Sequence, residues 1–139
     1  MILYKSKFLE VNYLELQHIT HFVFSEYAAY MDTEGIYHEM LNFLGQRIHK
    51  RSRLFYLDLQ KTDHLIEPEF FGWFEQYILP KLASFNARKL AYLTGLNPDQ
   101  HPENHIYTLP SGKDLEVRFF RQPQKLMQWL TESIPTNDA

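Results

Sequence analysis

The feature that most constrains the fold is an apolar run at residues 54–59, Leu-Phe-Tyr-Leu-Asp-Leu, in the middle of the chain. Apolar side chains stand at both odd and even positions, which is typical of a strand whose two faces are both covered by other layers. Asp58 falls where this strand should end and a loop begin. Because ligands and partners of open α/β sheets gather at that end of the strands, Asp58 is a candidate functional residue.

Composition limits the class of protein. The 139 residues, of which 45% are hydrophobic, suffice for one domain, expected over residues 1–134, with residues 135–139 as a frayed tail. Fourteen Lys and Arg against 17 Asp and Glu give a net charge of -3, which disfavours nucleic acid as a partner. Cysteine is absent, which excludes disulfides and thiolate metal sites. Charges near the amino terminus and the lack of a long apolar run predict a cytoplasmic protein without a membrane span.

Patterns before and after the central run predict an α/β domain. Residues 8–15 and 19–24 read as two strands, and their short connection predicts an antiparallel hairpin. Asp32 or Thr33 can cap a helix, whose apolar residues recur at every fourth position. These residues are Ile36, Met40, Leu44 and Ile48.

A second helix is predicted to begin at Pro68, and Pro80 should kink or break it near Gln76 because proline lacks a backbone N–H. Residues 89–94 form the next predicted strand, parallel to the central one through a right-handed crossover. Residues 106–109 could form a small strand within the loop-rich segment that follows.

The carboxyl-terminal part of the chain adds one main strand and one helix. The strand is predicted over residues 115–121 and the helix from Pro123, with its apolar residues facing the core. These residues are Leu126, Trp129, Leu130 and Ile134. The prediction is a mixed sheet of about five strands with an N-terminal antiparallel hairpin, parallel central strands and three main helices.

Two short motifs and the order of these elements carry a family resemblance. The residues Arg118-Phe119-Phe120 followed by Gln128-Trp129-Leu130 are similar to the Arg-Phe-Phe and Ala-x-x-Trp-Leu ending of small bacterial members of the STAS/SpoIIAA-like superfamily. The central strand also resembles theirs, and the likeness covers nearly the whole chain. It implies a STAS-like fold, a non-enzymatic binding or regulatory role, and recognition at the loop 61–66 after the central strand.

One departure from the family pattern concerns regulation. Anti-sigma-factor antagonists of this superfamily are switched by phosphorylation of a serine at the start of the helix after the central strand. Here residues 65–69 read Leu-Ile-Glu-Pro-Glu, without serine. Thr62 precedes the helix by more than a turn and lies beside Asp63, so a phosphate there would lack the helix dipole. We therefore expect constitutive binding, through Asp58, Thr62, Asp63, His64 and Glu67.

Catalytic and metal sites find little support in the sequence. His101 and His105, with Asp99 nearby, form the best local set of metal ligands, but Pro102 and the loop setting remove the helix that would align them. We expect a surface loop there, and neither metal nor cofactor. The chain also has no Gly-x-Ser-x-Gly turn and no phosphate loop. The sequence thus predicts a protein that is not an enzyme.

Two functional hypotheses remain, separated by where the aromatic residues lie. In the first, the chain is an interaction module whose partner is another protein or a second copy of itself, contacted through aromatics such as Tyr27, Tyr30 or Trp73. In the second, it binds a small molecule or lipid in an apolar pocket between the sheet and the helices. Aromatics lining a cavity favour a ligand, whereas a flat exposed patch favours a partner.

Overall fold

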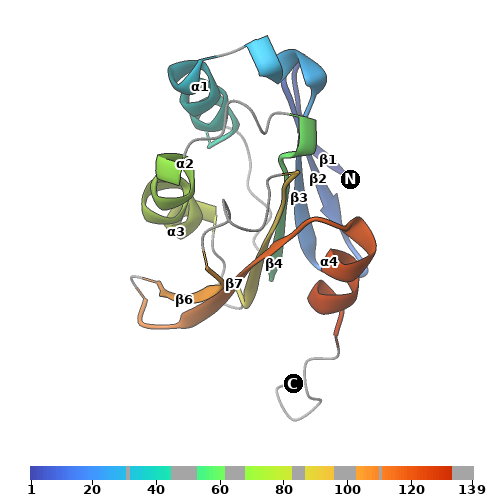
Figure 1. The fold of residues 1–139 in the computed structure, drawn as a ribbon, viewed down its shortest axis with the longest axis vertical. Helices are drawn as coiled ribbons and strands as arrows, with labels where there is room; N and C mark the ends of the chain where they lie inside the picture. Colours follow the sequence, from blue (N-terminus) through green and yellow to red (C-terminus); the bar gives the residue numbers. More distant parts are fainter. Residues whose placement is uncertain are drawn as a thin grey trace.

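The computed structural model describes residues 1–30, 32–44, 53–61, 68–82, 87–95, 103–109 and 111–132. These residues form one seven-stranded mixed sheet with helices on both faces (Figure 1). The strands are β1 (Ile2–Lys5), β2 (Leu9–Leu14), β3 (Ile19–Phe24), β4 (Leu54–Asp58), β5 (Lys89–Leu93), β6 (His105–Thr108) and β7 (Asp114–Phe120). The helices are the 3-10 helix η1 (Glu26–Tyr30), α1 (Thr33–Leu44), α2 (Pro68–Trp73), the π-helix η3 (Phe74–Ile78), α3 (Leu79–Leu82) and α4 (Pro123–Leu130).

The strand order across the sheet is β1-β2-β3-β4-β5-β7-β6. Strands β3, β4, β5 and β7 are parallel, whereas β1, β2 and β6 join by antiparallel pairing. The predicted antiparallel hairpin (β2 and β3) and the parallel pairing of β4 with β5 are confirmed.

The sheet has two strands more than the five expected. The strand β6 matches the small strand predicted near residue 106, shifted by one residue. The strand β1 was not predicted, because it is a short edge strand whose pairing with β2 shifts between Ile2 and Tyr4, so it lacks a regular alternation.

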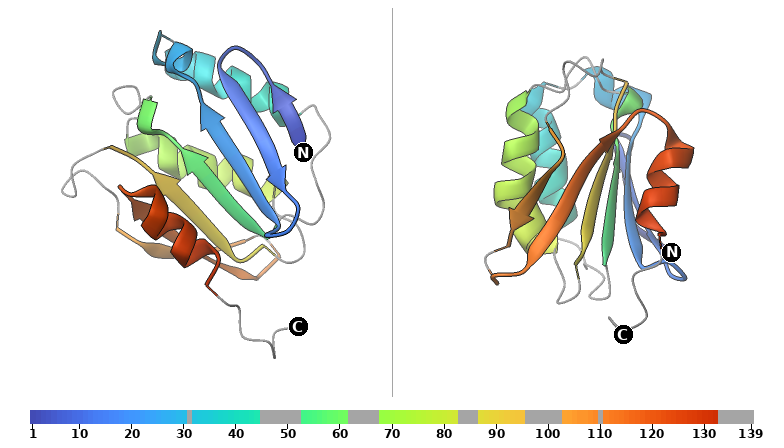
Figure 2. Two further views of the ribbon diagram at one scale, coloured as in Figure 1. Left: turned by 90° about the vertical axis from the view of Figure 1, so that its right-hand side faces the viewer. Right: turned by 60° about the horizontal axis from the view of Figure 1, so that its bottom comes forward.

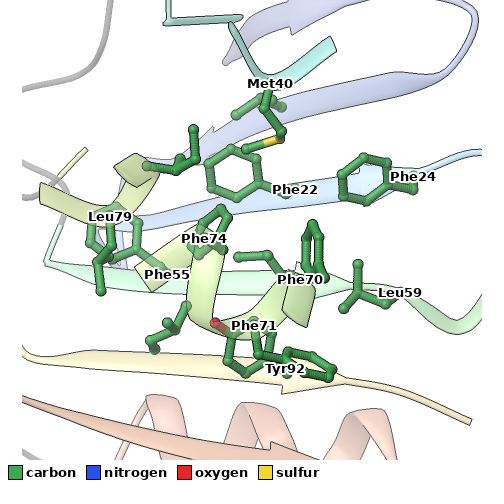
Figure 3. Packing of buried hydrophobic residues seen from close by; sticks show 14 of the residues in the cluster. Phe22, Phe24, Met40, Phe55, Leu59, Phe70, Phe71, Phe74, Leu79 and Tyr92 are labelled. Carbon is green, nitrogen blue, oxygen red and sulfur yellow. The ribbon is translucent and has the colours of Figure 1, made fainter. Parts of the chain in front are cut away.

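The helices divide between the two faces of the sheet. Helices α1 and α2–η3–α3 cover one face, and α4 lies on the other (Figures 1 and 2). On the central strand, Phe55 and Leu57 belong to the larger core with α1 and α2, whereas Leu54 and Tyr56 pack with α4. Large rings, among them Phe22 and Phe74, fill the space between the sheet and the first helix layer (Figure 3). The predicted coverage of β4 on both faces is confirmed.

The segment from α2 to α3 runs as one helix with a wider turn in its middle. The N–H of Leu79 bonds to the carbonyl of Phe74, five residues back, and Pro80 has no N–H for the carbonyl of Gln76. Two buried rows with a spacing of four residues result, Phe70, Phe74 and Ile78 in one, Phe71, Glu75 and Leu79 in the other. The disturbance expected from Pro80 therefore takes the form of a π-turn rather than a break.

A buried carboxylate fixes α1 to β1 and to the turn between β1 and β2. Glu39 on α1 is 7% exposed and accepts hydrogen bonds from the hydroxyl of Tyr4, at 2.7 Å, and from that of Ser6. The Ser6 hydroxyl oxygen also accepts the backbone N–H groups of Phe8 and Leu9, each at 3.1 Å. Because a buried carboxylate requires such partners, these bonds set where α1 lies on the sheet.

Helix α4 is held through Trp129. The Lys89 ammonium donates to the Trp129 carbonyl at 2.6 Å and lies 4.7 Å from the centre of its ring, and the Arg118 guanidinium lies 5.0 Å from that centre. Leu126 and Leu130 are buried with Trp129, as predicted. Ile134 and the predicted tail, residues 135–139, lie outside the described residues.

Candidate functional site

Asp58 ends the central strand, as predicted. Its side chain is half-buried, and Oδ1 accepts the backbone N–H of Gln60 at 3.1 Å, which shapes the turn that leaves β4. In the sheet it is level with Val23 on β3 and Leu93 on β5. The carboxylate therefore combines a structural role in the turn with a position at the carboxyl end of the parallel strands.

The other residues of the predicted site lie outside the described part of the chain. These are Thr62, Asp63, His64 and Glu67. Their role in binding stays a prediction from the sequence.

Asp58 lies on a face of the sheet that no described helix covers at this place. Helix α4 contacts β5 and β7 and reaches Ile19 at the start of β3, but it leaves most of β2 and β3 uncovered on its side (left view of Figure 2). The side chains there are half-buried and come from three adjacent strands. We call this surface the open face and define it by Glu10, Asn12, His21, Val23 and Asp58, which the strand register brings together.

The centre of the open face is a stack of two rings. The imidazole of His21 lies on the ring of Tyr56, with centroids 4.1 Å apart and planes 32° apart. Burial lowers the pKa of His21, although the carboxylates of Asp58 and Glu10 act in the opposite direction. The buried Nε2 of His21 has no hydrogen-bond partner among the described residues. At neutral pH the ring is therefore uncharged.

The charged side chains of the open face are the carboxylates of Glu10 and Asp58. Burial, together with Asp58, raises the pKa of Tyr56 to about 12, so its hydroxyl stays protonated. Glu10 accepts the amide of Asn12 at 2.8 Å and lies 3.7 Å from the Lys5 ammonium. The arrangement presents carboxylate oxygens beside a neutral imidazole, and carboxylates suit the donor groups of a partner.

Of the two histidines considered as a metal site, His105 lies in the described structure and His101 does not. His105 begins the strand β6 rather than lying in a surface loop, and its Nε2 is 2.6 Å from Oε1 of Glu75. Asp99 and His101 lie outside the described residues. Within the described ranges, no three His, Asp or Glu side chains are placed to hold a metal ion.

The aromatics expected to mediate self-association differ in exposure. Tyr27 is 47% exposed, with the Lys7 ammonium 4.8 Å from its ring centre. Trp73 is half-buried and stacks on Tyr37 of α1. The side chain of Tyr30 lies outside the described part of the structure. Of these residues, Tyr27 offers the larger exposed ring.

A hollow of about 520 Å³ lies where β7 ends and α4 begins. Two rings, two cations and one amide line it: Phe119, Phe120, Arg121, Gln122 and Lys125. The ligand hypothesis places a pocket between the sheet and the helices, but Phe22, Phe55 and Phe74 there are fully buried. The hollow is a concave feature at the carboxyl ends of the parallel strands.

Sequence reasoning missed Glu75. This residue is 6% exposed and lies in the buried row between Phe71 and Leu79. A single carboxylate at a spacing of four from two apolar residues is the signal that could have identified it, because acids are rarely buried without a partner.

Comparison of the chain with protein-family models, with curated proteins and with solved structures found no match. None of the described helices is both long and apolar enough to cross a membrane.

Proposed function

We propose that this chain is a non-enzymatic, STAS-like interaction or regulatory module that binds a protein partner through the open face and the end of β4. The observation that carries the proposal is the uneven covering of the sheet. Helices cover one face of the sheet, whereas on the other face α4 leaves most of β2 and β3 uncovered beside Asp58. The family resemblance supports a regulatory role, in a bacterial cytoplasm.

The shape and chemistry of the open face favour a protein over a small ligand. Its side chains come from three paired strands, and the hollow in the described structure is lined by other residues, so the open face suits a protein surface better than a small ligand. Its charged groups, Glu10 and Asp58, are carboxylates. The complementary partner surface carries Lys or Arg and hydrogen-bond donors that can pair with these carboxylates.

Binding is constitutive in this proposal. The sequence places no serine in the loop 61–66 or at the start of the next helix, and Glu67 already supplies negative charge there. A phosphate on Thr62 would lie beside Asp63 and would be repelled by it.

The test is capture of partners from the source cell with tagged protein, quantified by mass spectrometry. Asp58→Ala and the double variant Asp63→Ala, His64→Ala should lose the same partners, whereas Thr62→Glu should keep them. Asp114→Ala, which removes an exposed carboxylate of β7 that pairs with Thr108, is the matched control and should also keep them. Thermal unfolding of each variant separates lost binding from lost folding.

Two outcomes would overturn parts of the proposal. Retention of all partners by Asp58→Ala would remove the open face from the binding site. A change of the bound set in Thr62→Glu alone would mean that the module is switched by phosphorylation.

A second candidate function, binding of a small molecule, is favoured by the hollow at β7 and α4. Its size is within the range of ligand sites, about 300–1,000 Å³, and its rings and cations suit an aromatic or aliphatic anion. The fluorescent probe anilinonaphthalene sulfonate should bind wild type and lose affinity in the double variant Arg121→Ala, Lys125→Ala. Lys61→Ala is the control, and equal binding by all three proteins would exclude this site.

A further inference from the structure

The buried carboxylate of Glu75 receives hydrogen bonds from two other elements. Glu75 belongs to the π-helix η3. The hydroxyl of Tyr92 on β5 donates to Oε2 at 3.3 Å, and Nε2 of His105 on β6 lies 2.6 Å from Oε1. Burial and the Glu75 carboxylate hold the pKa of Tyr92 well above its usual range, so its phenol remains a donor.

The two contacts of the His105 ring define its proton state. Nδ1 lies 2.8 Å from the carbonyl oxygen of Glu103, which can only accept, so Nδ1 carries a hydrogen. Nε2 faces a carboxylate, which also accepts when it is ionised. Both contacts are therefore satisfied together by the imidazolium, in which both nitrogens donate. The neutral ring has one hydrogen and can keep only one contact.

Among the described residues, the charge that faces His105 is the carboxylate of Glu75. Glu75 faces it from η3, Tyr92 lies beyond Glu75 on β5, and the Phe119 ring of β7 is 6.4 Å away between centroids. From its own segment, Glu103 contributes the backbone carbonyl. Partial burial lowers the pKa of His105, but the hydrogen bond to Glu103 and the Glu75 carboxylate outweigh it, so the net pKa is raised.

The strand β6 depends on few other attachments. It has four residues and lies at the edge of the sheet, where β7 is its one partner among the described strands. Within it, Ile106 and Thr108 are exposed, and Tyr107 packs against the core. Just before β6, the side-chain oxygen of Asn104 accepts a hydrogen bond from the backbone N–H of Phe119 at 2.9 Å. The hydroxyl of Thr108 donates to Asp114 of β7 at 2.9 Å. The contact between His105 and Glu75 is therefore a bond that ties β6 to the helix layer rather than to β7.

We propose that His105 and Glu75 form a proton-dependent clamp, which fastens the edge strand β6 to η3 when the imidazole is protonated and loosens it when the proton leaves. Because the pKa of His105 is raised on folding, the stabilisation is complete below the unfolded value and is lost as the pH rises through the folded value. The pH range over which this stabilisation is lost begins at about pH 6.5, the ordinary pKa of histidine. Across this range, the equilibrium constant for opening β6 should rise by up to about tenfold per pH unit. Above the folded pKa it should stay constant.

The experiment is amide hydrogen exchange by NMR, expressed as protection factors so that the pH dependence of intrinsic exchange is removed. Amides of β6 and their partners on β7 should lose protection between about pH 6 and pH 8.5, whereas amides of β4 should not. The titration of the His105 ring, followed in the same samples, should show a pKa above that of a free histidine.

Three variants separate the clamp from general packing. His105→Gln removes the titrating group and should make the protection of β6 independent of pH. Glu75→Gln keeps an acceptor for Tyr92 but removes the charge, so the pKa of His105 should fall. Glu103→Gln changes an exposed side chain and leaves its carbonyl in place, so it should behave like wild type.

Protection of β6 that does not change with pH in wild type would overturn the proposal. The same holds for a pH dependence that persists in His105→Gln, or for a His105 pKa at or below the free value. If Glu75→Gln fails to fold, the titration of wild type and the exchange data for His105→Gln still test the proposal.

Discussion

The ring of Tyr37 stacks on the indole of Trp73, with centroids 3.9 Å apart and planes 10° apart. The pair joins α1 to α2 above the sheet, where Phe70 lies 6.3 Å from the same indole. Trp73 was expected to be available for self-association, but its ring already has a partner within the chain. Stacking of this kind contributes free energy beyond the apolar area that it buries.

A double-mutant cycle measures that contribution. Tyr37→Leu, Trp73→Leu and the double variant should give a coupling free energy of about 0.5–1.5 kcal/mol in chemical denaturation. The matched pair Tyr27→Leu and Trp73→Leu should be additive, because no contact between them is present in the described structure. A coupling of zero for Tyr37 and Trp73 would mean that the rings pack without a specific interaction.

The central strand should be sensitive to loss of volume. Leu57→Ala removes a fully buried side chain and should lower the free energy of unfolding by about 2–5 kcal/mol. Lys61→Ala changes an exposed residue shortly after the same strand and should cost less than about 0.5 kcal/mol. Equal, small losses in chemical denaturation would contradict the position of β4 in the core.

The pKa values of the open face should respond to Asp58. The Asp58 charge raises the pKa of both His21 and Tyr56, so Asp58→Asn should lower both in an NMR titration. Glu116→Gln, a change on β7 of the same face, is the control and should leave them unchanged. A rise of either pKa in Asp58→Asn would show that burial, not charge, dominates the effect of this residue.

The lowered pKa of His21 predicts how the free energy of unfolding changes in acid. Because burial lowers its folded pKa, its contribution is complete above the unfolded value and is lost as the pH falls below about 6.5. The urea concentration at the midpoint of unfolding should therefore fall less between neutral and mildly acidic pH in His21→Phe than in wild type. An unchanged acid dependence would assign that loss to other groups.

Zinc should not stabilise the protein. A metal that binds the native state raises the melting temperature by mass action, and His105 is already engaged by Glu75. Samples with and without added zinc should melt alike. A zinc-dependent rise that both His101→Ala and His105→Ala abolish would establish the metal site that we do not expect.

Local signals in the sequence determined the central strand and the starts of two helices. The apolar run at residues 54–59 defines a strand covered on both faces because strand periodicity is read within six residues. Pro68 and Pro123 mark helix starts, since proline lacks the N–H that the first turn leaves unused anyway. Asp58 was identified in the same way, from its place at the end of a strand.

The tertiary structure alone decided which of these elements meet. The open face arises because β2, β3 and β4 are neighbours while α4 lies over β5 and β7, an arrangement that no local pattern contains. Likewise, Glu75 and His105 are 30 residues apart in the chain. Their contact depends on the π-turn and on the register of an edge strand, and these follow from packing between distant segments rather than from the periodicity of either one.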